Sequence, residues 1–170
     1  MPFGNPANVD VYTGRGDENQ GDGVSILAPQ RYWEDVNEGD TIPGFSHKLN
    51  WTRICMQVSG SQDFNPVHHD PQYAREAGHE EMFINTGWYQ ANFGRIATSF
   101  AGDEGFVRRF RMEMRRMNQL GDVSTWGGKV ARKYVSDEGD HCVDLDLWVE
   151  NDRHGVTTPA QATVILPSKG

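Results

Sequence analysis

The sequence predicts an α+β domain in which one long central helix is wrapped by an antiparallel sheet. Residues 85–101 repeat bulky apolar side chains at helical spacing, and residues 141–167 alternate apolar and polar side chains as strands do. The 170 residues are enough for one domain with a buried core. No internal repeat is visible.

The long helix is predicted over residues 85–101, because two apolar stripes follow its length. The main stripe has 4-3-4 spacing: Tyr89, Phe93, Ile96 and Phe100. A second stripe of mixed size lies beside it: Trp88, Ala91 and Gly94. Such a wide apolar surface suits a helix covered by a large element. About 16 residues at 1.5 Å each span about 24 Å, the width of a small sheet.

The strands are predicted after this helix, where the period changes to two. Four apolar residues face one way: Val143, Leu145, Leu147 and Val149. A turn at "NDRHG" then leads into a strand over residues 156–167, with Pro159 near its start. Residues 106–117 and 123–135 indicate two more strands, separated by Gly121-Asp122. We expect the four to form a meander.

The first half of the chain is less regular. Residues 1–28 are rich in Gly, Asn and Asp, which predicts a flexible arm before an ordered domain over residues 29–170. Thr52 is predicted to cap a short helix that stops at Ser59-Gly60. Asp70-Pro71 predicts another helix start, with Gly78 as its stop.

Charge and cysteine content narrow the function classes. A net charge of −8 disfavours nucleic acid or an anionic membrane as the main partner. No run approaches the roughly 20 apolar residues of a membrane helix, and the N-terminus lacks the pattern of a signal peptide. Cys55 and Cys142 are far apart and lack metal-ligand spacing, which fits a reducing cytoplasm.

The stretch "SQDFNPVHHDPQYA", residues 61–74, carries the candidate chemistry. Asp63 and His68 would be separated by up to roughly 17 Å if the chain were extended. Pro66 forces Asn65 out of the helical region, and the Asn65 side chain can brace a bend. A bend that brings the carboxylate and imidazole to one water makes a general acid/base pair.

Two other interpretations of this stretch stay open on the residues alone. One Asp and one His in a turn are usually solvent-exposed residues without a catalytic role. A zinc site is the other alternative, although adjacent histidines tend to point apart and no metal motif matches. Its ligands would be His68, His69, Asp70 and His79.

The string "DFNPVHHDPQYA" resembles the signature of the MaoC-like, (R)-specific enoyl-CoA hydratases, whose domains have the hot-dog fold. The pattern is matched by Asp63, Asn65, Pro66, Val67, His68 and Ala74. The resemblance covers residues 32–167. Two departures are visible: Ser61-Gln62 lie between Ser-Gly and the aspartate, and Thr86 stands where the family has His or Pro.

The resemblance implies a single hot-dog domain that adds water to a trans-2-enoyl-CoA thioester, or removes it from the 3-hydroxyacyl form. Asp63 and His68 would activate the water, with one of them handling the α-carbon proton. The backbone N–H of Gly87 would receive the thioester oxygen. Independently, the first N–H groups of a helix are unpaired and lie at its positive end, and glycine permits close approach. The alternative for Gly87 is packing alone.

Other functions of hot-dog proteins remain as alternatives. Thioesterases and another dehydratase type resemble each other in placing a carboxylate on the central helix, but residues 85–101 contain no Asp or Glu. A non-catalytic subunit that binds acyl-CoA is the second alternative. A chain that retains both Asp63 and His68 would be the catalytic half of such a pair.

The resemblance also implies partners. The substrate is a coenzyme A thioester, no separate cofactor is expected, and a homodimer or higher oligomer is expected from the family. The phosphates of coenzyme A require local positive charge, for which "VRRFRMEMRR" and "KVARK" are candidates, without preference for any single arginine. Trp88, next to Gly87, would either line an acyl tunnel or pack the helix.

Overall fold

The computed structural model describes residues 30–170. The predicted arm over residues 1–28 lies outside the described residues, so it stays a prediction. Elements follow in chain order: η2 (Trp33–Asp35), β1 (Thr41–Lys48), α1 (Trp51–Ser61), η3 (Pro66–His68), α2 (Pro71–Glu76), α3 (Thr86–Ala101), β2 (Phe106–Met112), β3 (Val123–Val135), β4 (His141–Asn151) and β5 (Gly155–Ile165).

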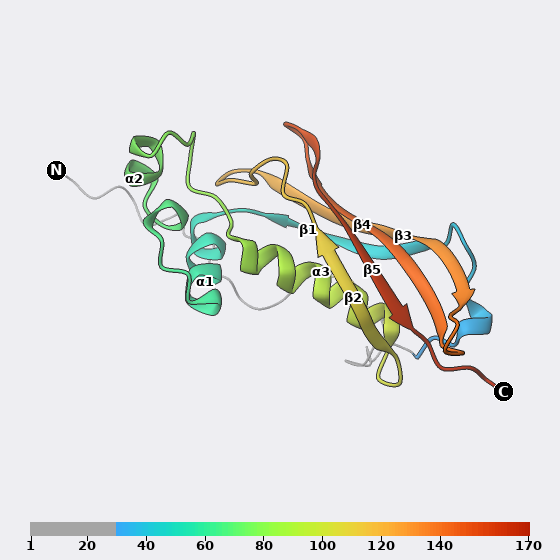
Figure 1. The fold of residues 1–170 in the computed structure, drawn as a ribbon. Coiled ribbons are helices and arrows are strands. Elements are labelled where there is room, and N and C mark those ends of the chain that lie inside the picture. Colours follow the sequence, from blue (N-terminus) through green and yellow to red (C-terminus); the bar gives the residue numbers. More distant parts are fainter. Residues whose placement is uncertain (1–29) are drawn as a thin grey trace, which may run out of the picture.

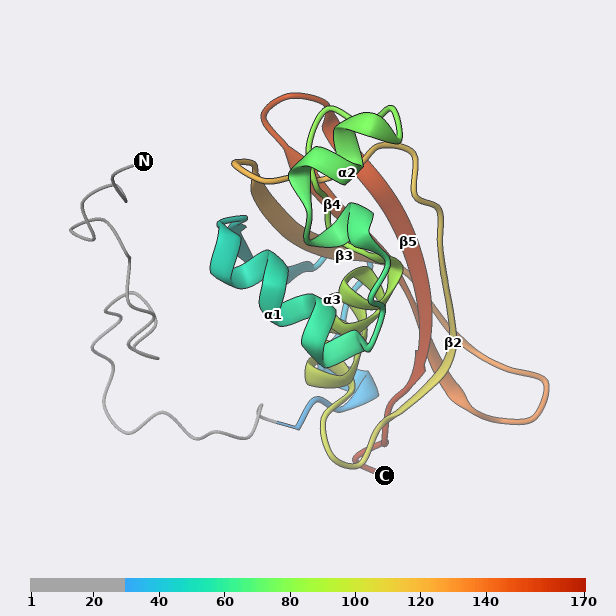
Figure 2. The same cartoon turned by 90° about the vertical axis from the view of Figure 1, so that its left-hand side faces the viewer.

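One five-stranded antiparallel sheet packs against α3, as the sequence predicts. Figure 1 shows α3 lying along one face of the sheet, with α1 and α2 beyond its beginning. Viewed from that end, α1 lies in front of α3 while β5 and β2 curve around the other side (Figure 2). The described residues therefore form a sheet wrapped around a helix, with a small helical cap at one end.

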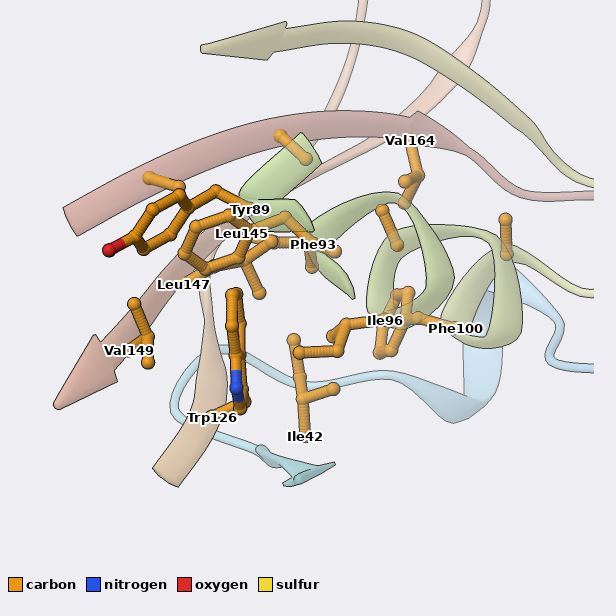
Figure 3. Close-up of a cluster of buried hydrophobic side chains, with 14 of the residues drawn as sticks. Ile42, Tyr89, Phe93, Ile96, Phe100, Trp126, Leu145, Leu147, Val149 and Val164 are labelled. Carbon is orange, nitrogen blue, oxygen red and sulfur yellow. The ribbon is translucent and has the colours of Figure 1, made fainter. Parts of the chain in front are cut away.

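The core lies between α3 and the concave face of the sheet. The main stripe of α3 is buried at 5% exposure or less, and so are the alternating residues of β4. Phe93 meets Trp126 of β3 edge-on, with ring centroids 4.8 Å apart (Figure 3). Full burial of each such side chain contributes about 1.5–3 kcal/mol.

The second predicted stripe of α3 lies at the margin of this core, and only Trp88 packs against it. Ala91 is exposed, whereas Trp88 and Gly94 are only partly buried. The sheet covers one side of the helix, and this stripe is rotated about the helix axis away from that side. Asn92 and Ala97 are buried in its place.

The strand order is β1-β3-β4-β5-β2, which corrects the predicted four-strand meander. Only β3, β4 and β5 are consecutive neighbours, and β2 pairs with β5 at the far edge. The predicted strand 106–117 ends at Met112. Beyond it the amides of Arg115 and Arg116 both bond to the carbonyl of Thr157, which breaks the regular ladder.

The helix α1 begins earlier and ends later than predicted. Asn50, not Thr52, is the N-cap, and its side chain accepts a bond from the Arg53 N–H at 2.9 Å. The helix continues through Ser59-Gly60 to Ser61, and its C-cap, Gln62, adopts a left-handed conformation. The start of α2 is confirmed, because Asp70 accepts from two amides of its first turn. Within residues 30–170, none of the helices has the length and apolar character needed to cross a membrane.

Candidate active site

Asp63 and His68 meet at the end of the molecule where α3 begins. The His68 Nε2 atom lies 3.3 Å from Asp63 Oδ2. The imidazole is buried, with 9% of its side chain exposed, whereas the carboxylate is 44% exposed. The structure thus brings together the two residues that the sequence singled out, with one of them open to solvent.

The bend between them has a local cause. Asn65 is held at φ −60° and ψ 125°, the extended region that Pro66 imposes on the residue before it. The Asn65 side chain accepts a bond from the Val67 N–H at 3.2 Å, and its carbonyl accepts one from His68 N–H at 3.0 Å. These bonds close a short 3-10 turn over Asn65 and Pro66, whose role in supporting the site stays a prediction.

A backbone carbonyl orients the imidazole. His68 Nδ1 lies 2.9 Å from the oxygen of Phe83, which can only accept, so Nδ1 carries the proton. In the neutral ring the lone pair is then on Nε2, which faces Asp63. Phe83 is bridged to Gln119: the Ile84 N–H donates to the Asn118 carbonyl, and the Met82 carbonyl accepts from the Leu120 N–H. The Phe83 carbonyl is therefore turned away from the bridge and is free for His68.

This pair can act as a water-holding base. Both Nε2 of neutral His68 and the Asp63 carboxylate accept hydrogen bonds, and a water has two protons to donate. A water beside the pair, at hydrogen-bond distance from both atoms, would be held by two bases, either of which can take a proton. The exposed carboxylate leaves one side of this position open to a ligand.

The loop that carries the pair is joined to the beginning of α3 by Ser61. The Ser61 hydroxyl donates to the Gln57 carbonyl at 2.7 Å and accepts from Asn85 Nδ2 at 2.6 Å. It also lies 3.4 Å from the Asp63 amide. Asn85 is the N-cap of α3 and bonds to the Trp88 N–H at 3.0 Å. One hydroxyl thus connects the acid/base loop to the helix cap.

Gly87 lies in the first turn of α3 and has a packing role. A Cβ added there would lie 3.0 Å from Ser61 Cβ, so a side chain would press on α1. The Gly87 N–H donates no hydrogen bond among residues 30–170. The packing interpretation therefore has structural support, and the amide remains free for a ligand oxygen.

Trp88 turns toward β1. Its ring centroid lies 6.0 Å from that of His47, and its indole N–H has no partner in the described part of the chain. Burial, together with the positive charges of Arg53 and Arg95, lowers the pKa of His47 to about 4. The ring of Trp88 also packs on the core, so packing is established and the tunnel role stays a prediction.

Three arginines of the two predicted basic stretches line the same cavity. Arg109 and Arg111 from β2 line a cavity of about 240 Å³ together with Arg132 from β3. Asp144 and Asp146 line the same cavity and bond to side chains of β5. The two predicted phosphate-binding stretches therefore come together in space, in a surface of mixed charge.

The zinc alternative gains no support. Among residues 30–170 there is no group of three histidine, cysteine or acidic side chains arranged to hold a metal ion. Cys55 is exposed, Cys142 is buried, and both are free.

Three positions of the site were not predicted from the sequence. Phe83 acts through its backbone, which leaves no signature in the residue type. Ser61 lies within the dipeptide that departs from the family pattern. Gln57 is buried between Ile54 and Val58 on the inner face of α1, and a polar residue on an apolar helical stripe is a signal that periodicity can detect.

Known structures share this architecture. The chain is similar to R-hydratase PhaJ1 from Pseudomonas aeruginosa in the unliganded form, with TM-score 0.69 and 19% identity over 84% of this chain and 88% of that one. The fold is the hot-dog fold. It is the fold that the sequence resemblance implied.

Two further structures have the same fold. The MaoC-like dehydratase from Rhodospirillum rubrum gives TM-score 0.67 and 20% identity, over 82% of this chain and 99% of that one. A chain of the ChsH1-ChsH2 complex from Mycobacterium tuberculosis gives TM-score 0.68 and 21% identity, over 76% of this chain and 98% of that one. No family model matches the chain, and no curated protein sequence matches it.

Proposed function

We propose that the protein is a MaoC-like hydro-lyase that hydrates a trans-2-enoyl-CoA thioester to the (R)-3-hydroxyacyl form, or catalyses the reverse. The observation that carries the proposal is the 3.3 Å approach of His68 Nε2 to Asp63 Oδ2 beside the beginning of α3. The hydratase and dehydratase names of the similar structures support the same class of reaction.

The chemistry follows from the positions of these groups. A water held by Asp63 and His68 loses a proton to the pair as its oxygen bonds to the β-carbon. The electrons of the double bond move toward the thioester, whose oxygen gains negative charge near the Gly87 amide. The pair then delivers a proton to the α-carbon, so one water is added and nothing is oxidised or reduced. An acid/base pair of this kind contributes about 10²–10⁴-fold in rate.

Other activities of the fold have less support. A thioesterase of this architecture carries a carboxylate on its central helix, and α3 contains none. The ChsH1-ChsH2 structure is a complex of two proteins, which keeps a two-subunit assembly as the second candidate. With Asp63 and His68 both in place, this chain would then supply the working site. Otherwise we expect a homodimer.

The ligand and its location complete the proposal. Coenzyme A is proposed as part of the substrate, with no separate cofactor. Its phosphates would need cations, and the cavity lined by Arg109, Arg111 and Arg132 is the place where the predicted stretches meet. The cytoplasmic location inferred from cysteine content stays a prediction.

Hydration of crotonyl-CoA, followed by loss of the enoyl absorbance, tests the proposal. The wild-type protein is expected to hydrate it, and Asp63→Asn to lose activity. Asp70→Asn is the matched control, because it makes the same chemical change seven residues away and asparagine caps a helix as well as aspartate does. Absence of wild-type activity across enoyl-CoAs of short, long and branched chains would overturn the proposal.

A further inference from the structure

Gln57, in the middle of α1, is a buried polar side chain with half of its carboxamide unused. The residue is 4% exposed. Its Oε1 atom accepts a hydrogen bond from the Asn85 N–H at 3.0 Å. Its Nε2 atom has no hydrogen-bond partner in the part of the chain that the structure describes.

The orientation of this carboxamide is determined by its partner. The Asn85 N–H is a donor, so Gln57 must present its oxygen there, and the nitrogen cannot exchange places with it. A buried amide donor without an acceptor costs about 1–3 kcal/mol. Such groups in native proteins are usually paired with water or a ligand, which makes the free nitrogen a candidate contact for a bound molecule.

The unused nitrogen belongs to a carboxamide that contacts the beginning of α3, where the proposed thioester oxygen would be received. Gln57 and Ser61 are one helical turn apart in α1, and both contact the beginning of α3. Gln57 meets the Asn85 amide, while Ser61 meets the Asn85 side chain and approaches Gly87. Two donors with no acceptor among residues 30–170, Gln57 Nε2 and Gly87 N–H, therefore belong to residues at or in contact with the same helix start.

We propose that Gln57 Nε2 donates a second hydrogen bond to the thioester oxygen that Gly87 N–H receives. This inference rests on the hydro-lyase function proposed above and assigns a further catalytic residue to it. The oxygen gains charge as water adds, so a fixed donor stabilises the transition state more than the ground state. Loss of one donor of this kind typically lowers kcat by about 10²–10³-fold.

Gln57→Glu is the discriminating variant. Glutamate keeps an oxygen for the Asn85 N–H and replaces the free donor with an acceptor. We expect kcat to fall about 10²-fold at neutral pH, and the ratio of variant to wild-type kcat to recover as the pH is lowered, because a protonated carboxyl regains an O–H donor. A residue needed only to hold Asn85 would show no such recovery. Gln62→Glu, an exposed change at the end of the same helix, is the charge control.

The carbonyl stretch of bound butyryl-CoA, a saturated thioester, supplies a readout that needs no turnover. Donors shift this infrared band to lower frequency, so Gln57→Glu is expected to move it back toward its position in water. If Gln57→Glu does not fold, Gln57→Met is expected to give the same band shift. An unshifted band in the folded variant overturns the inference, even if activity falls. An inactive wild type with a Gln57-dependent band would instead overturn only the hydro-lyase proposal.

Discussion

Two polar clusters pack against the first half of α3, and they differ in whether their hydrogen bonds are complete. The first is a network of four buried residues, Tyr89, Asn118, Asp122 and Asn151, with the partly exposed Arg153 at its edge. Asn118 bonds to the Tyr89 hydroxyl at 3.0 Å and accepts from Asn151 at 2.9 Å. Asp122 receives Arg153 at 2.6 and 2.9 Å. Each of these side chains is paired.

The second cluster, around Asp63, has groups left open. The Asp63 carboxylate is 44% exposed and faces an imidazole at 3.3 Å. Gln57 Nε2 has no acceptor among residues 30–170, and the Gly87 N–H donates to none of them. The polar groups of the first cluster bond to one another and hold loops together, whereas the second cluster has donors and acceptors available to a ligand. We therefore expect substitutions in the two clusters to affect different quantities.

The largest effect is expected from His68. His68→Gln removes the Nε2 base, so kcat for hydration is expected to fall about 10²–10⁴-fold. The free energy of unfolding should change little, because the side-chain N–H of the introduced glutamine can still donate to the Phe83 carbonyl. Steady-state kinetics and urea titration measure the two quantities. His69→Gln is the neighbouring control, and a variant that loses stability but keeps kcat would reverse the comparison.

The opposite outcome is expected for the buried network. Among residues 30–170, Asp122→Ala leaves Arg153 with only Glu80, at 3.2 Å, as an acidic partner. Removing one member of a buried ion pair costs about 3–5 kcal/mol, and we expect the lower end because Arg153 is partly exposed. Urea unfolding gives the value, with exposed Asp152→Ala as a control within about 0.5 kcal/mol. A large fall in kcat with unchanged stability would contradict this assignment.

Two glycines of α3 provide a smaller contrast. Gly87→Ala places a Cβ 3.0 Å from Ser61 Cβ, whereas Gly94→Ala meets nothing within 4 Å. We expect Gly87→Ala to cost about 1 kcal/mol of unfolding free energy and to lower kcat by displacing α1. Gly94→Ala should stabilise the helix by about 0.5–1 kcal/mol. Thermal melts compare them, and equal stabilisation by both would remove the packing argument.

The smallest effect concerns His47, which has a pKa of about 4 in the folded protein and 6.5 in a model peptide. Between these values the unfolded chain binds the proton more readily, so stability falls as pH drops from 6.5 toward 4. Solvent screening of this half-buried ring limits the effect to about 1 kcal/mol. His47→Gln should flatten that part of the stability–pH curve. If His47→Gln has the same slope of unfolding free energy against pH as the exposed control His154→Gln, the predicted contribution of His47 is wrong.

The sequence predicted the elements whose signals are local. The alternation from Val143 to Val149 and the helical stripe from Tyr89 to Phe100 depend only on period, and both were confirmed. The rigid effect of Pro66 on Asn65 is equally local, which is why the bend could be predicted. The pairing of β2 with β5 could not, because strand order depends on which edge the chain reaches after a loop.

The groups that support the site could not be predicted from the sequence for a related reason. The Phe83 carbonyl orients His68 from 15 residues away, and a backbone atom has no residue-type signature. Asn50, not the predicted Thr52, caps α1, and residue type alone does not separate them because both are good caps and stand two positions apart. Spatial neighbours of this kind become visible only when the chain is folded.

A double-mutant cycle on hydration tests most directly whether Asp63 and His68 share one water. kcat is measured for the wild type, Asp63→Asn, His68→Gln and the double variant. We predict that each single change lowers kcat about 10²–10⁴-fold, and that the double variant is within about threefold of the worse single one, because groups acting as a unit are not additive. Losses that multiply, or a single variant with wild-type kcat, would contradict the account.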